Sequence, residues 1–487
     1  MAFLERNANR GSISTGYDID NSLKLERGNS EKLSRTPSSA SNSKKWTYSF
    51  WLKRTQLGIN SYHLEAKGSG DRFFILGFNE NDNLLIYDIY SDDYGKVLRM
   101  KFRDIAAWYH IVLAIDTTDG TAGNRNKFYV NGVLVTDYVT DYGDFPQNHD
   151  TQINKAVVHN IGYRTDINQY ASGYQAETCL IDGAALAPTS FGEFDDSGIW
   201  KPIDVTESTF GTNGFYQEYE SSSALGADTV PGGNSNDYAA SNIAAADQAT
   251  DTPTNNFATS NFLISQGGYF VTTEGGTKCV LGTAGPGNNT GGVSALSTIA
   301  VSKGKWYMEM KNDLANDSVD SYARFGFVDV GDLADGGVDG QMIAKAGSAA
   351  GAYFGGTGGG RYHYNNTAQG NSTTWIRQVM GMALDLDNRK AYFHIDGTYT
   401  NSGDPANGTD NGGQYDMNTG GDGIYVDETW VLGASAYNLG IFLMNWGGYT
   451  VMPISSAETD ANGYGTFEYA PPSGYYALCS KNLAEYG

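Results

Sequence analysis

A two-strand pattern occurs twice in this chain and constrains the fold more than any other feature. Residues 112–135 read VLAIDTTDGTAGNRNKFYVNGVLV, and residues 383–399 read ALDLDNRKAYFHIDGTY. In both, an apolar alternation ends in an acidic, polar loop, a basic residue opens a second alternation, and Asn-Gly or Asp-Gly closes it. Alternation with a period of two is typical of strands, and a type I′ hairpin turn needs the positive φ that Asn-Gly supplies. We therefore predict hairpin turns at Asn131-Gly132 and Asp396-Gly397, in two sandwiches of related architecture.

Alternating segments fill most of the chain. Residues 46–54, WTYSFWLKR, put Trp46, Tyr48 and Phe50 on one face. Turn residues separate such segments at intervals of about 8–20 residues, which is typical of a β-sandwich. The chain has 62 Gly, 33 Tyr, 21 Phe and 8 Trp among 487 residues, which suits aromatic strands joined by glycine turns. We predict an all-β protein with two sandwiches, because one core rarely serves so long a chain.

Changes in composition divide the chain into four parts. Residues 1–21 are polar and without periodicity, and we expect an N-terminal arm. Residues 22–221 form the first predicted sandwich, and residues 263–487 form the second. Residues 222–262 are small, polar and interrupted by proline, so they cannot bury enough apolar area to fold alone. We expect them to be a linker, or a strap that lies over neighbouring strands.

The charge excludes some classes of partner. The 32 basic and 55 acidic residues give a net charge of −23, which argues against nucleic acid and against an anionic membrane. Residues 1–54 hold 10 basic and 5 acidic residues, whereas residues 206–487 hold 11 and 29. The basic N-terminal residues could bind an acidic neighbouring protein, or their charges could simply be solvated.

The first residues, the lack of a long apolar stretch and the cysteines indicate where the chain is made. The start, MAFLERNANRGS, lacks an apolar core with a cleavage site, and no stretch approaches 18 apolar residues. We therefore expect neither a signal peptide nor membrane insertion. Cys179, Cys279 and Cys479 are odd in number and lie in separate apolar runs. Buried free thiols made in a reducing cytosol are expected, rather than a disulfide or a zinc site.

Several segments resemble known families. The first sandwich resembles the laminin-G-like, concanavalin A-like lectin modules, through WTYSFWLKR, WYHIVLAID, KFYVNGVLV and AETCLIDGAAL. The second resembles a SPRY domain, itself a concanavalin A-like sandwich, through GKWYMEMK, ARFGFVDV and VMGMALDLDNRKAYFHIDG. The stretches LSRTPSSASNSKKWTYSFWLKR, DTPTNNFAT and YAPPSGYYALCSKNL resemble virion proteins of tailed bacteriophages that join these two modules. Together the resemblance covers residues 22–487.

The resemblance implies a non-enzymatic structural protein of a phage virion, made in the host cytoplasm and present in several copies per particle. A tail-fibre-like or other surface appendage would recognise a host surface glycan or protein. The alternative is a capsid decoration or fibre protein that contacts only other virion subunits. From the sequence we expect neither heptads nor an anchoring domain before residue 22. Attachment to other virion proteins would therefore use the basic arm or an exposed sandwich face.

Some concanavalin A-like folds are glycoside hydrolases, so a glycan-cleaving enzyme is a third hypothesis. A retaining glycosidase needs two carboxyl groups about 5–5.5 Å apart. Hydrolases of this fold usually carry Glu-x-Asp-x-x-Glu, which the chain lacks. The nearest pairs are Glu218 with Glu220 and Asp385 with Asp387. We interpret the first pair as a solvent-facing strand and the second as a hairpin-stabilising strand end, and we assign no catalytic residue.

Other catalytic patterns are missing from the sequence. His110, His159 and His394 each lie in a strand pattern beside aromatic residues, and we interpret them as core or edge residues. No Gly-x-Ser-x-Gly occurs. The glycine-rich stretches do not follow a strand and open a helix, so no nucleotide cofactor is implied.

Two kinds of ligand remain open. Laminin-G-like modules often hold calcium through loop carboxylates, and the candidates for ligands are Asp92, Asp93, Asp332, Asp335 and Asp339. Solvated acidic loops are the alternative, and no other cofactor is expected.

Glycan binding needs aromatic faces beside amide or carboxylate groups. Glycine-rich contexts give six candidates for such a site: Arg361, Tyr362, Tyr364, Asn445, Trp446 and Tyr449.

Overall fold

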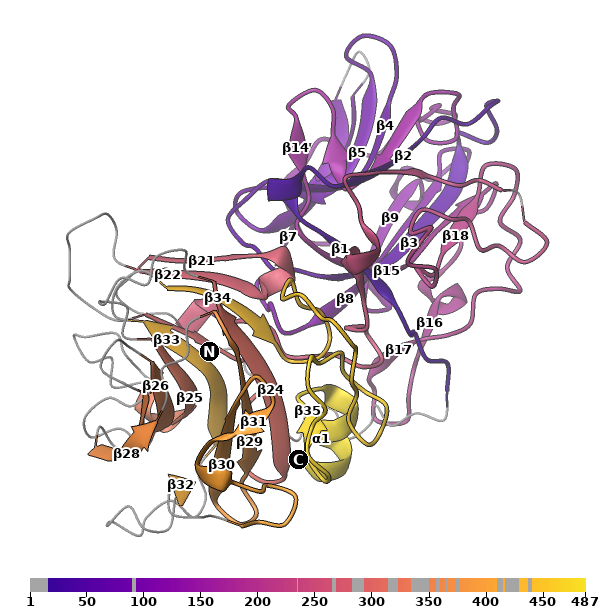
Figure 1. Ribbon diagram of the computed structural model, residues 1–487. Helices are drawn as coiled ribbons and strands as arrows, with labels where there is room; N and C mark the ends of the chain where they lie inside the picture. The colour runs from indigo at the N-terminus through magenta and orange to yellow at the C-terminus, as the bar shows by residue number, and fades with distance from the viewer. Residues whose placement is uncertain are drawn as a thin grey trace. The chain divides into compact units, whose positions relative to one another are not determined.

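The computed structural model divides the chain into two compact units of strands (Figure 1). The first unit spans Ser14–Asn255 and the second spans Asn256–Gly487. The structure describes residues 16–89, 93–233, 235–264, 269–282, 293–313, 323–333, 350–355, 360–364, 367–372, 377–409, 415–416, 429–436 and 440–487.

The first unit contains two large antiparallel sheets. Its strands are β1 Ser22–Leu25, β2 Lys32–Arg35, β3 Lys45–Lys53, β4 Ser61–Lys67, β5 Phe73–Phe78, β6 Asn83–Ile89, β7 Asp93–Lys101, β8 Trp108–Asp116, β9 Asn126–Val130, β10 Val133–Val135, β11 Tyr138–Asp141, β12 Val158–Ile161, β13 Tyr163–Arg164, β14 Gln169–Tyr170, β15 Gly173–Asp182, β16 Gly192–Phe194, β17 Trp200–Pro202, β18 Phe215–Gln217, β19 Ala239–Ser241 and β20 Gln248–Ala249. Sheet 1A has the order β10-β9-β8-β3-β15-β1-β20, with β18 beside β15, and sheet 1B has the order β11-β7-β6-β5-β4-β12-β2-β19. The pairs β13–β14 and β16–β17 form two small sheets.

The second unit also has two large sheets. Its elements are β21 Tyr269–Thr273, β22 Lys278–Gly282, β23 Val293–Leu296, β24 Lys305–Asn312, β25 Ala323–Asp329, β26 Ala350–Gly355, β27 Gly360–Tyr364, β28 Thr367–Ser372, β29 Val379–Asp385, β30 Lys390–Ile395, β31 Thr398–Tyr399, β32 Tyr415–Asp416, β33 Trp430–Ala436, β34 Gly440–Asn445, β35 Tyr476–Ala477 and the helix α1 Ser480–Tyr486. Sheet 2A has the order β21-β22-β34-β24-β29-β30-β31, with β32 beside β30 and β35 beside β24. Sheet 2B has the order β23-β33-β25-β26-β27-β28.

Short 3₁₀ helices occur in both units. Their bounds are η1 Arg27–Asn29, η2 Ala122–Asn124, η3 Pro188–Ser190, η4 Ala245–Asp247, η5 Phe262–Ile264, η6 Glu274–Gly276, η7 Gly331–Leu333 and η8 Thr400–Ser402. None of the helices in the described part of the chain is long and apolar enough to cross a membrane.

The two units follow one order of strands. In the first, β1, β3, β8 to β10 and β15 lie in sheet 1A, while β2, β4 to β7 and β12 lie in sheet 1B. In the second, β22, β24, β29 to β31 and β34 lie in sheet 2A, while β23, β25 to β28 and β33 lie in sheet 2B. In both units the chain therefore passes from one sheet to the other at equivalent strands. The predicted all-β fold with two related sandwiches is confirmed.

The repeated sequence pattern forms the same three-stranded meander in each unit, β8–β9–β10 and β29–β30–β31. Asn131 and Gly132 have φ values of 48° and 77°, and Asp396 and Gly397 have values of 46° and 78°. Positive φ at both central residues is the requirement of a type I′ turn. Both predicted hairpin turns are therefore confirmed.

The first residue of each turn also ties the turn to the strand that opens the meander. The backbone N–H of His110 donates to Asn131 Oδ1 at 2.8 Å, and the N–H of Asn131 donates to the His110 carbonyl at 2.9 Å. The N–H of Val379 donates to Asp396 Oδ1 at 2.9 Å, and the N–H of Asp396 donates to the Val379 carbonyl at 2.8 Å. The same pair of bonds thus closes both meanders.

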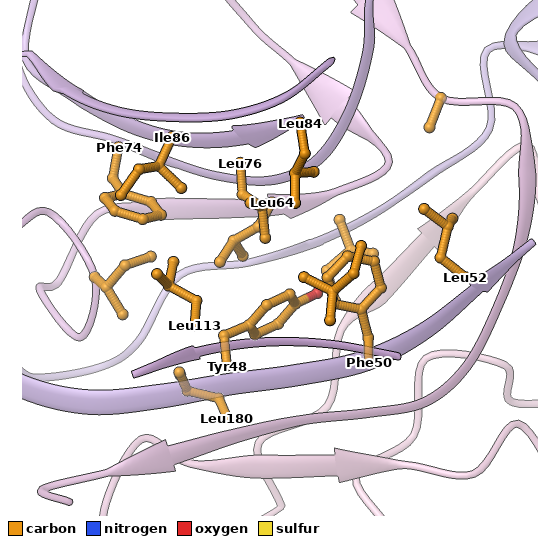
Figure 2. Close-up of a cluster of buried hydrophobic side chains, with 14 of the residues drawn as sticks. Tyr48, Phe50, Leu52, Leu64, Phe74, Leu76, Leu84, Ile86, Leu113 and Leu180 are labelled. Atoms are coloured by element: carbon orange, nitrogen blue, oxygen red, sulfur yellow. The ribbon is translucent and has the colours of Figure 1, made fainter. Parts of the chain in front are cut away.

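The main core of the first unit lies between sheets 1A and 1B. Trp46, Tyr48 and Phe50 of β3 belong to it, as the alternation of residues 46–54 predicts. Figure 2 shows Tyr48 and Phe50 beneath Leu76 and Leu84, which come from the opposite sheet. Burial of each such side chain contributes roughly 1.5–3 kcal/mol, so these alternations hold the two sheets together.

The N-terminal arm is shorter than residues 1–21. Residues 1–15 lie outside the described residues, but Tyr17 and Ile19 already pack in the first unit. The Tyr17 hydroxyl donates to Glu177 Oε1 at 3.0 Å, and the backbone N–H of buried Ile19 donates to Thr254 Oγ1 at 3.0 Å. These partners are distant in sequence, so the polar composition of the segment did not reveal them.

Residues 222–262 do not form a separate linker. Within this range β19 pairs with β2 and β20 pairs with β1, at one edge of each sheet of the first unit, and the second unit begins at Asn256. Asp251 secures the segment, because its carboxylate lies 2.6 Å from Lys53 Nζ and accepts from Trp108 Nε1 at 3.1 Å. The ion pair is buried, and a buried charge needs such partners.

Predictions about buried residues hold. The three cysteines are free and buried. His110, His159 and His394 are buried as well, in agreement with their interpretation as core residues.

We expect Gly132→Ala to destabilise the first unit by about 1–3 kcal/mol. Gly132 has a φ of 77°, and an added Cβ would lie 2.4 Å from the Trp200 ring. Gly120→Ala is the matched control, because nothing lies within 4 Å of its added Cβ. Urea unfolding followed by tryptophan fluorescence should give a lower midpoint for Gly132→Ala alone. Equal midpoints for the two variants would contradict the assigned turn.

Candidate functional site

Three of the residues predicted to bind glycan are buried, so this part of the prediction is wrong. Trp446 is 0% exposed and belongs to the main core of the second unit. The alternation of β34 carries past its end, so Phe442, Met444 and Trp446 all face that core. Asn445 and Tyr449 are also buried. None of the three side chains offers a face to a sugar.

The other predicted ligand-binding residues are placed only by their backbone. Arg361, Tyr362 and Tyr364 lie in β27, and their side chains are outside the described residues. The same holds for two of the calcium candidates, Asp93 at the start of β7 and Asp332 in η7. The remaining candidates, Asp92, Asp335 and Asp339, lie outside the described residues altogether. Among the side chains that are described, no group of three His, Cys, Asp or Glu residues could hold a metal ion.

Of the carboxylate pairs considered for catalysis, Asp385 and Asp387 make contacts that stabilise the fold. Asp385 lies 2.9 Å from Lys305 Nζ and accepts from the N–H of Asn388 at 2.9 Å, so it stabilises the β29–β30 hairpin as predicted. Asp387 Oδ1 accepts from the backbone N–H of Gly304 at 2.8 Å. The other pair, Glu218 and Glu220, is not in a strand, because β18 ends at Gln217.

A buried carboxylate, Glu309 of β24, binds the C-terminal segment to sheet 2A. Its Oε1 accepts from the Tyr307 hydroxyl at 3.0 Å and from the N–H of Tyr469 at 2.8 Å. Its Oε2 accepts from Asn445 Nδ2 at 3.0 Å and from the N–H of Glu468 at 2.9 Å. Burial raises the pKa of Glu309 to about 7. Four protein donors occupy this carboxylate, so it serves as a structural clamp.

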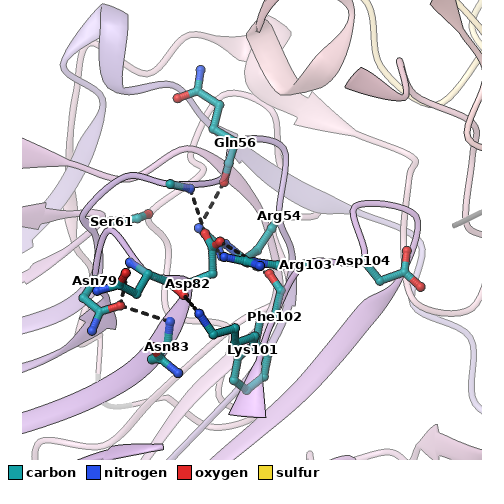
Figure 3. Close-up of polar contacts among 12 residues, drawn as sticks. Arg54, Gln56, Ser61, Asn79, Asp82, Asn83, Lys101, Phe102, Arg103 and Asp104 are labelled. Carbon is teal, nitrogen blue, oxygen red and sulfur yellow. Dashed lines mark hydrogen bonds and ion pairs between the residues drawn. The ribbon is translucent and has the colours of Figure 1, made fainter. Parts of the chain in front are cut away.

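A second charged cluster, around Asp82, joins the two sheets of the first unit (Figure 3). Asp82 precedes β6 of sheet 1B, and buried Arg54 follows β3 of sheet 1A. Arg54 donates to Asp82 Oδ1 at 3.0 Å, and Arg103 Nε lies 2.8 Å from Asp82 Oδ2. Burial alone would raise the pKa of Asp82, but the N–H of Gly58 and the two guanidinium groups hold it below its ordinary value. Both carboxylate oxygens of Asp82 therefore have partners within the first unit.

Exposed aromatic surface is found instead on the outer side of sheet 1B. Leu84 and Ile86 of β6 face the main core, whereas Leu85 and Tyr87 face away from it. Tyr62 of β4 lies on the same outer side, and Tyr142 follows β11 at the sheet edge. We call Tyr62, Tyr87 and Tyr142 the tyrosine face.

Glycines on neighbouring strands position two of these rings. Tyr62 pairs with Gly77 of β5, and Tyr87 pairs with Gly95 of β7. A Cβ added at Gly77 would lie 2.6 Å from Tyr62 Cδ1, and one added at Gly95 would lie 2.7 Å from Tyr87 Cδ1. Each ring therefore leans over the glycine opposite it. Close packing of this kind fixes the direction of the ring before any ligand arrives.

Tyr142 completes the face. Its N–H donates to the Gly95 carbonyl at 2.9 Å, and its ring centroid lies 5.6 Å from that of Tyr87. The side chain of Tyr142 is 51% exposed, and Tyr87 is half-buried. Tyr62 is covered, because the Arg164 guanidinium lies 5.0 Å from its ring centroid and donates to its hydroxyl at 3.0 Å. Tyr87 and Tyr142 thus present ring surface on this side of the sheet.

Sequence reasoning missed this site. The stretch NLLIYDIY shows by its alternation that Tyr87 points away from the core, so one signal was present. The pairing of Tyr87 with Gly95 depends on strand register across a turn that contains no Asn-Gly or Asp-Gly. Tyr142 reaches the face only because β11 joins the edge of sheet 1B.

Residues 27–184 match a family model described as the concanavalin A-like lectin/glucanases superfamily. The matched range includes β2 to β15 and all three residues of the tyrosine face. The first unit is therefore similar to concanavalin A-like modules over this range. None of the curated protein sequences matches the chain.

Similar solved structures each cover part of the chain. A native heptameric SAP-like pentraxin from Limulus polyphemus is 16% identical, with 35% of this chain and 80% of that chain covered and a TM-score of 0.26. The TRIM65 PSpry domain is 14% identical, with 38% and 91% covered and a TM-score of 0.26. Domain 4 of AbnA, a GH43 extracellular arabinanase from Geobacillus stearothermophilus, was solved in complex with arabinotriose. It is 19% identical, with 32% and 68% covered and a TM-score of 0.25.

The Glu309 clamp predicts a pH dependence of stability. Its pKa is raised from 4.5 to about 7 in the folded protein. The folded state therefore holds a proton that the unfolded state has already lost, and this group's contribution to stability falls as the pH rises from 4.5 to about 7. We expect Glu309→Gln to flatten that slope in thermal unfolding of the second unit. Glu458→Gln, at an exposed side chain, should keep the slope, and an unchanged slope in Glu309→Gln would contradict the assignment.

Proposed function

We propose that the chain is a non-enzymatic glycan-binding protein of a phage virion, and that the tyrosine face contacts the sugar. One observation carries the proposal. Tyr87 and Tyr142 expose ring surface on a sandwich whose residues 27–184 match the concanavalin A-like lectin/glucanases superfamily. Aromatic rings of this kind pack against the C–H face of a sugar, and rim hydroxyl groups bond to its hydroxyls.

The physical mechanism is weak stacking repeated over many copies. The Tyr87 ring packs over Gly95, and the backbone N–H of Tyr142 donates to the Gly95 carbonyl. Because these contacts hold both residues in place, little conformational freedom is lost when a sugar binds. A single shallow site of two rings gives weak binding. Several copies on one particle raise the effective concentration, and avidity then exceeds single-site affinity by about 10²–10⁴.

The engaged carboxylates support the non-enzymatic part of the proposal. Asp385 and Asp387 bond within the β29–β30 region, and four donors occupy Glu309. Glu177 accepts from Tyr17 and Tyr216, and burial raises its pKa to about 8. None of these carboxylates lies on the tyrosine face.

The virion part of the proposal rests on the resemblance of three stretches to phage proteins. Under it, a tail-fibre-like or other appendage recognises a host surface glycan, and other virion proteins are the attachment partners. A capsid decoration or fibre role is the second candidate. The exposed apolar side chains Val133, Leu134 and Phe194 of the first unit favour contacts with other subunits in either role.

Tyr142→Ala should weaken glycan binding about tenfold, because it removes the more exposed ring of the pair. A microarray of bacterial surface polysaccharides identifies a ligand for the full chain, and isothermal titration measures its affinity with and without Ca²⁺. Phe194→Ala is the matched control, since Phe194 is 52% exposed and Tyr142 is 51% exposed. Failure of the unmodified chain to bind any polysaccharide would overturn the proposed function. Unchanged affinity in Tyr142→Ala would overturn the site.

A further inference from the structure

A second exposed apolar area lies on the outer side of sheet 1A. It consists of Leu134 of β10, which lies opposite the outward-facing Tyr129, and of Phe194 and Trp200, which face each other across the β16–β17 hairpin. We call these three residues the docking patch. Leu134 and Phe194 are 45% and 52% exposed. Large apolar side chains exposed together commonly mark a contact surface.

A column of aromatic rings supports the patch from below. Trp51 of β3 stacks on His110 of β8 with ring centroids 4.6 Å apart and an interplanar angle of 23°. His110 stacks on Trp200 at 5.9 Å and 21°. Phe194 then meets Trp200 edge-on at 4.9 Å and 66°. The exposed Phe194 is therefore the outer end of a column that begins on the sheet.

Hydrogen bonds lock this column in one arrangement. Trp200 Nε1 donates to His110 Nδ1 at 2.9 Å, and His110 Nε2 lies 2.8 Å from Ser49 Oγ. Indole N–H is only a donor, so Nδ1 accepts and Nε2 carries the proton of the neutral imidazole. Burial lowers the pKa of His110 to about 3, so the imidazole stays neutral over the physiological range.

Two glycines fit the Trp200 ring closely. A Cβ at Gly132 would lie 2.4 Å from the ring, and one at Gly192 would lie 2.6 Å from it. Gly132 belongs to the β9–β10 turn and directly precedes Val133, so the same contact brings the hairpin and the edge strand together. The patch is thus rigid before binding, which lowers the entropy lost on association.

The β16–β17 hairpin that carries Phe194 and Trp200, and the segment that follows it, are acidic in sequence. Residues 193–207, EFDDSGIWKPIDVTE, contain five acidic residues and one basic residue. Glu193 and Asp196 flank Phe194 closely in sequence and are exposed. An apolar centre with a charged rim is the usual arrangement of a protein-binding surface.

We propose that the docking patch binds a protein partner whose surface presents an apolar pocket rimmed by Lys and Arg. The exposed aliphatic side chain of Leu134 suits protein side chains better than sugar hydroxyls. A second copy of this chain is disfavoured, because a two-fold contact would set the acidic rims against each other. The proposal is independent of glycan binding, since the tyrosine face and the docking patch lie on different sheets.

Selection of a random-peptide display library on the full chain tests the proposal. We expect enriched peptides that carry an apolar anchor flanked by Lys or Arg. A synthetic copy of the best peptide should bind at least about tenfold more weakly to Leu134→Ser and to Phe194→Ala than to the unmodified chain. Leu263→Ser is the matched control, because Leu263 is 44% exposed and Leu134 is 45% exposed.

Each other outcome overturns the proposal. No enrichment, enrichment of peptides without basic residues, or equal binding by the patch variants would do so. Dimerisation of the unmodified chain that Leu134→Ser abolishes, seen by analytical ultracentrifugation, would identify a second copy as the occupant. Loss of polysaccharide binding in Phe194→Ala would place the hairpin in the glycan site instead. Tyr142→Ala should keep peptide binding, so failure here is distinct from failure of the proposed function.

Discussion

The register of the three-stranded meander is the constraint on which each sandwich depends. Side chains alternate along a strand, so a slip of one residue would turn a whole apolar row away from the core. Asn131 and Asp396 prevent such a slip, because each binds both backbone groups of one residue on the opening strand. The turn therefore determines which side chains of β8–β10 and of β29–β31 meet the opposite sheet. Glycine at the next position also admits a neighbouring ring, Trp200 at Gly132 and Tyr469 at Gly397.

Several buried charged groups connect separate parts of each unit. Arg54 and Asp82 join the sheets of the first unit, and Glu309 binds the C-terminal segment to sheet 2A. Lys53 and Asp251 fasten the segment that contains β20. Each of these charged groups is engaged within its own unit. Exposed side chains remain in the tyrosine face (Tyr142) and in the docking patch (Leu134 and Phe194), and glycines on neighbouring elements pack against Tyr62, Tyr87 and Trp200.

Local patterns in the sequence were sufficient for the strands and the turns, because alternation and Asn-Gly chemistry act within a few residues. Buried histidines and thiols followed from their apolar neighbours. Polar composition did not reveal partners that are distant in sequence. Ile19 meets Thr254, and β20 pairs with β1, within segments predicted as an arm and as a linker or strap. Trp446 is buried because the alternation of β34 carries one residue past the strand end, directly before the glycine pair that suggested an exposed loop. The tyrosine face depends on register across β6 and β7, which no short motif encodes.

The most direct test of glycan recognition by the first unit is an experimental structure of the full chain with a bound oligosaccharide from the host surface. A sugar ring packed against Tyr87 or Tyr142, on the outer side of sheet 1B, is the result that this account predicts. A sugar bound only to the second unit, with the tyrosine face empty, would contradict it.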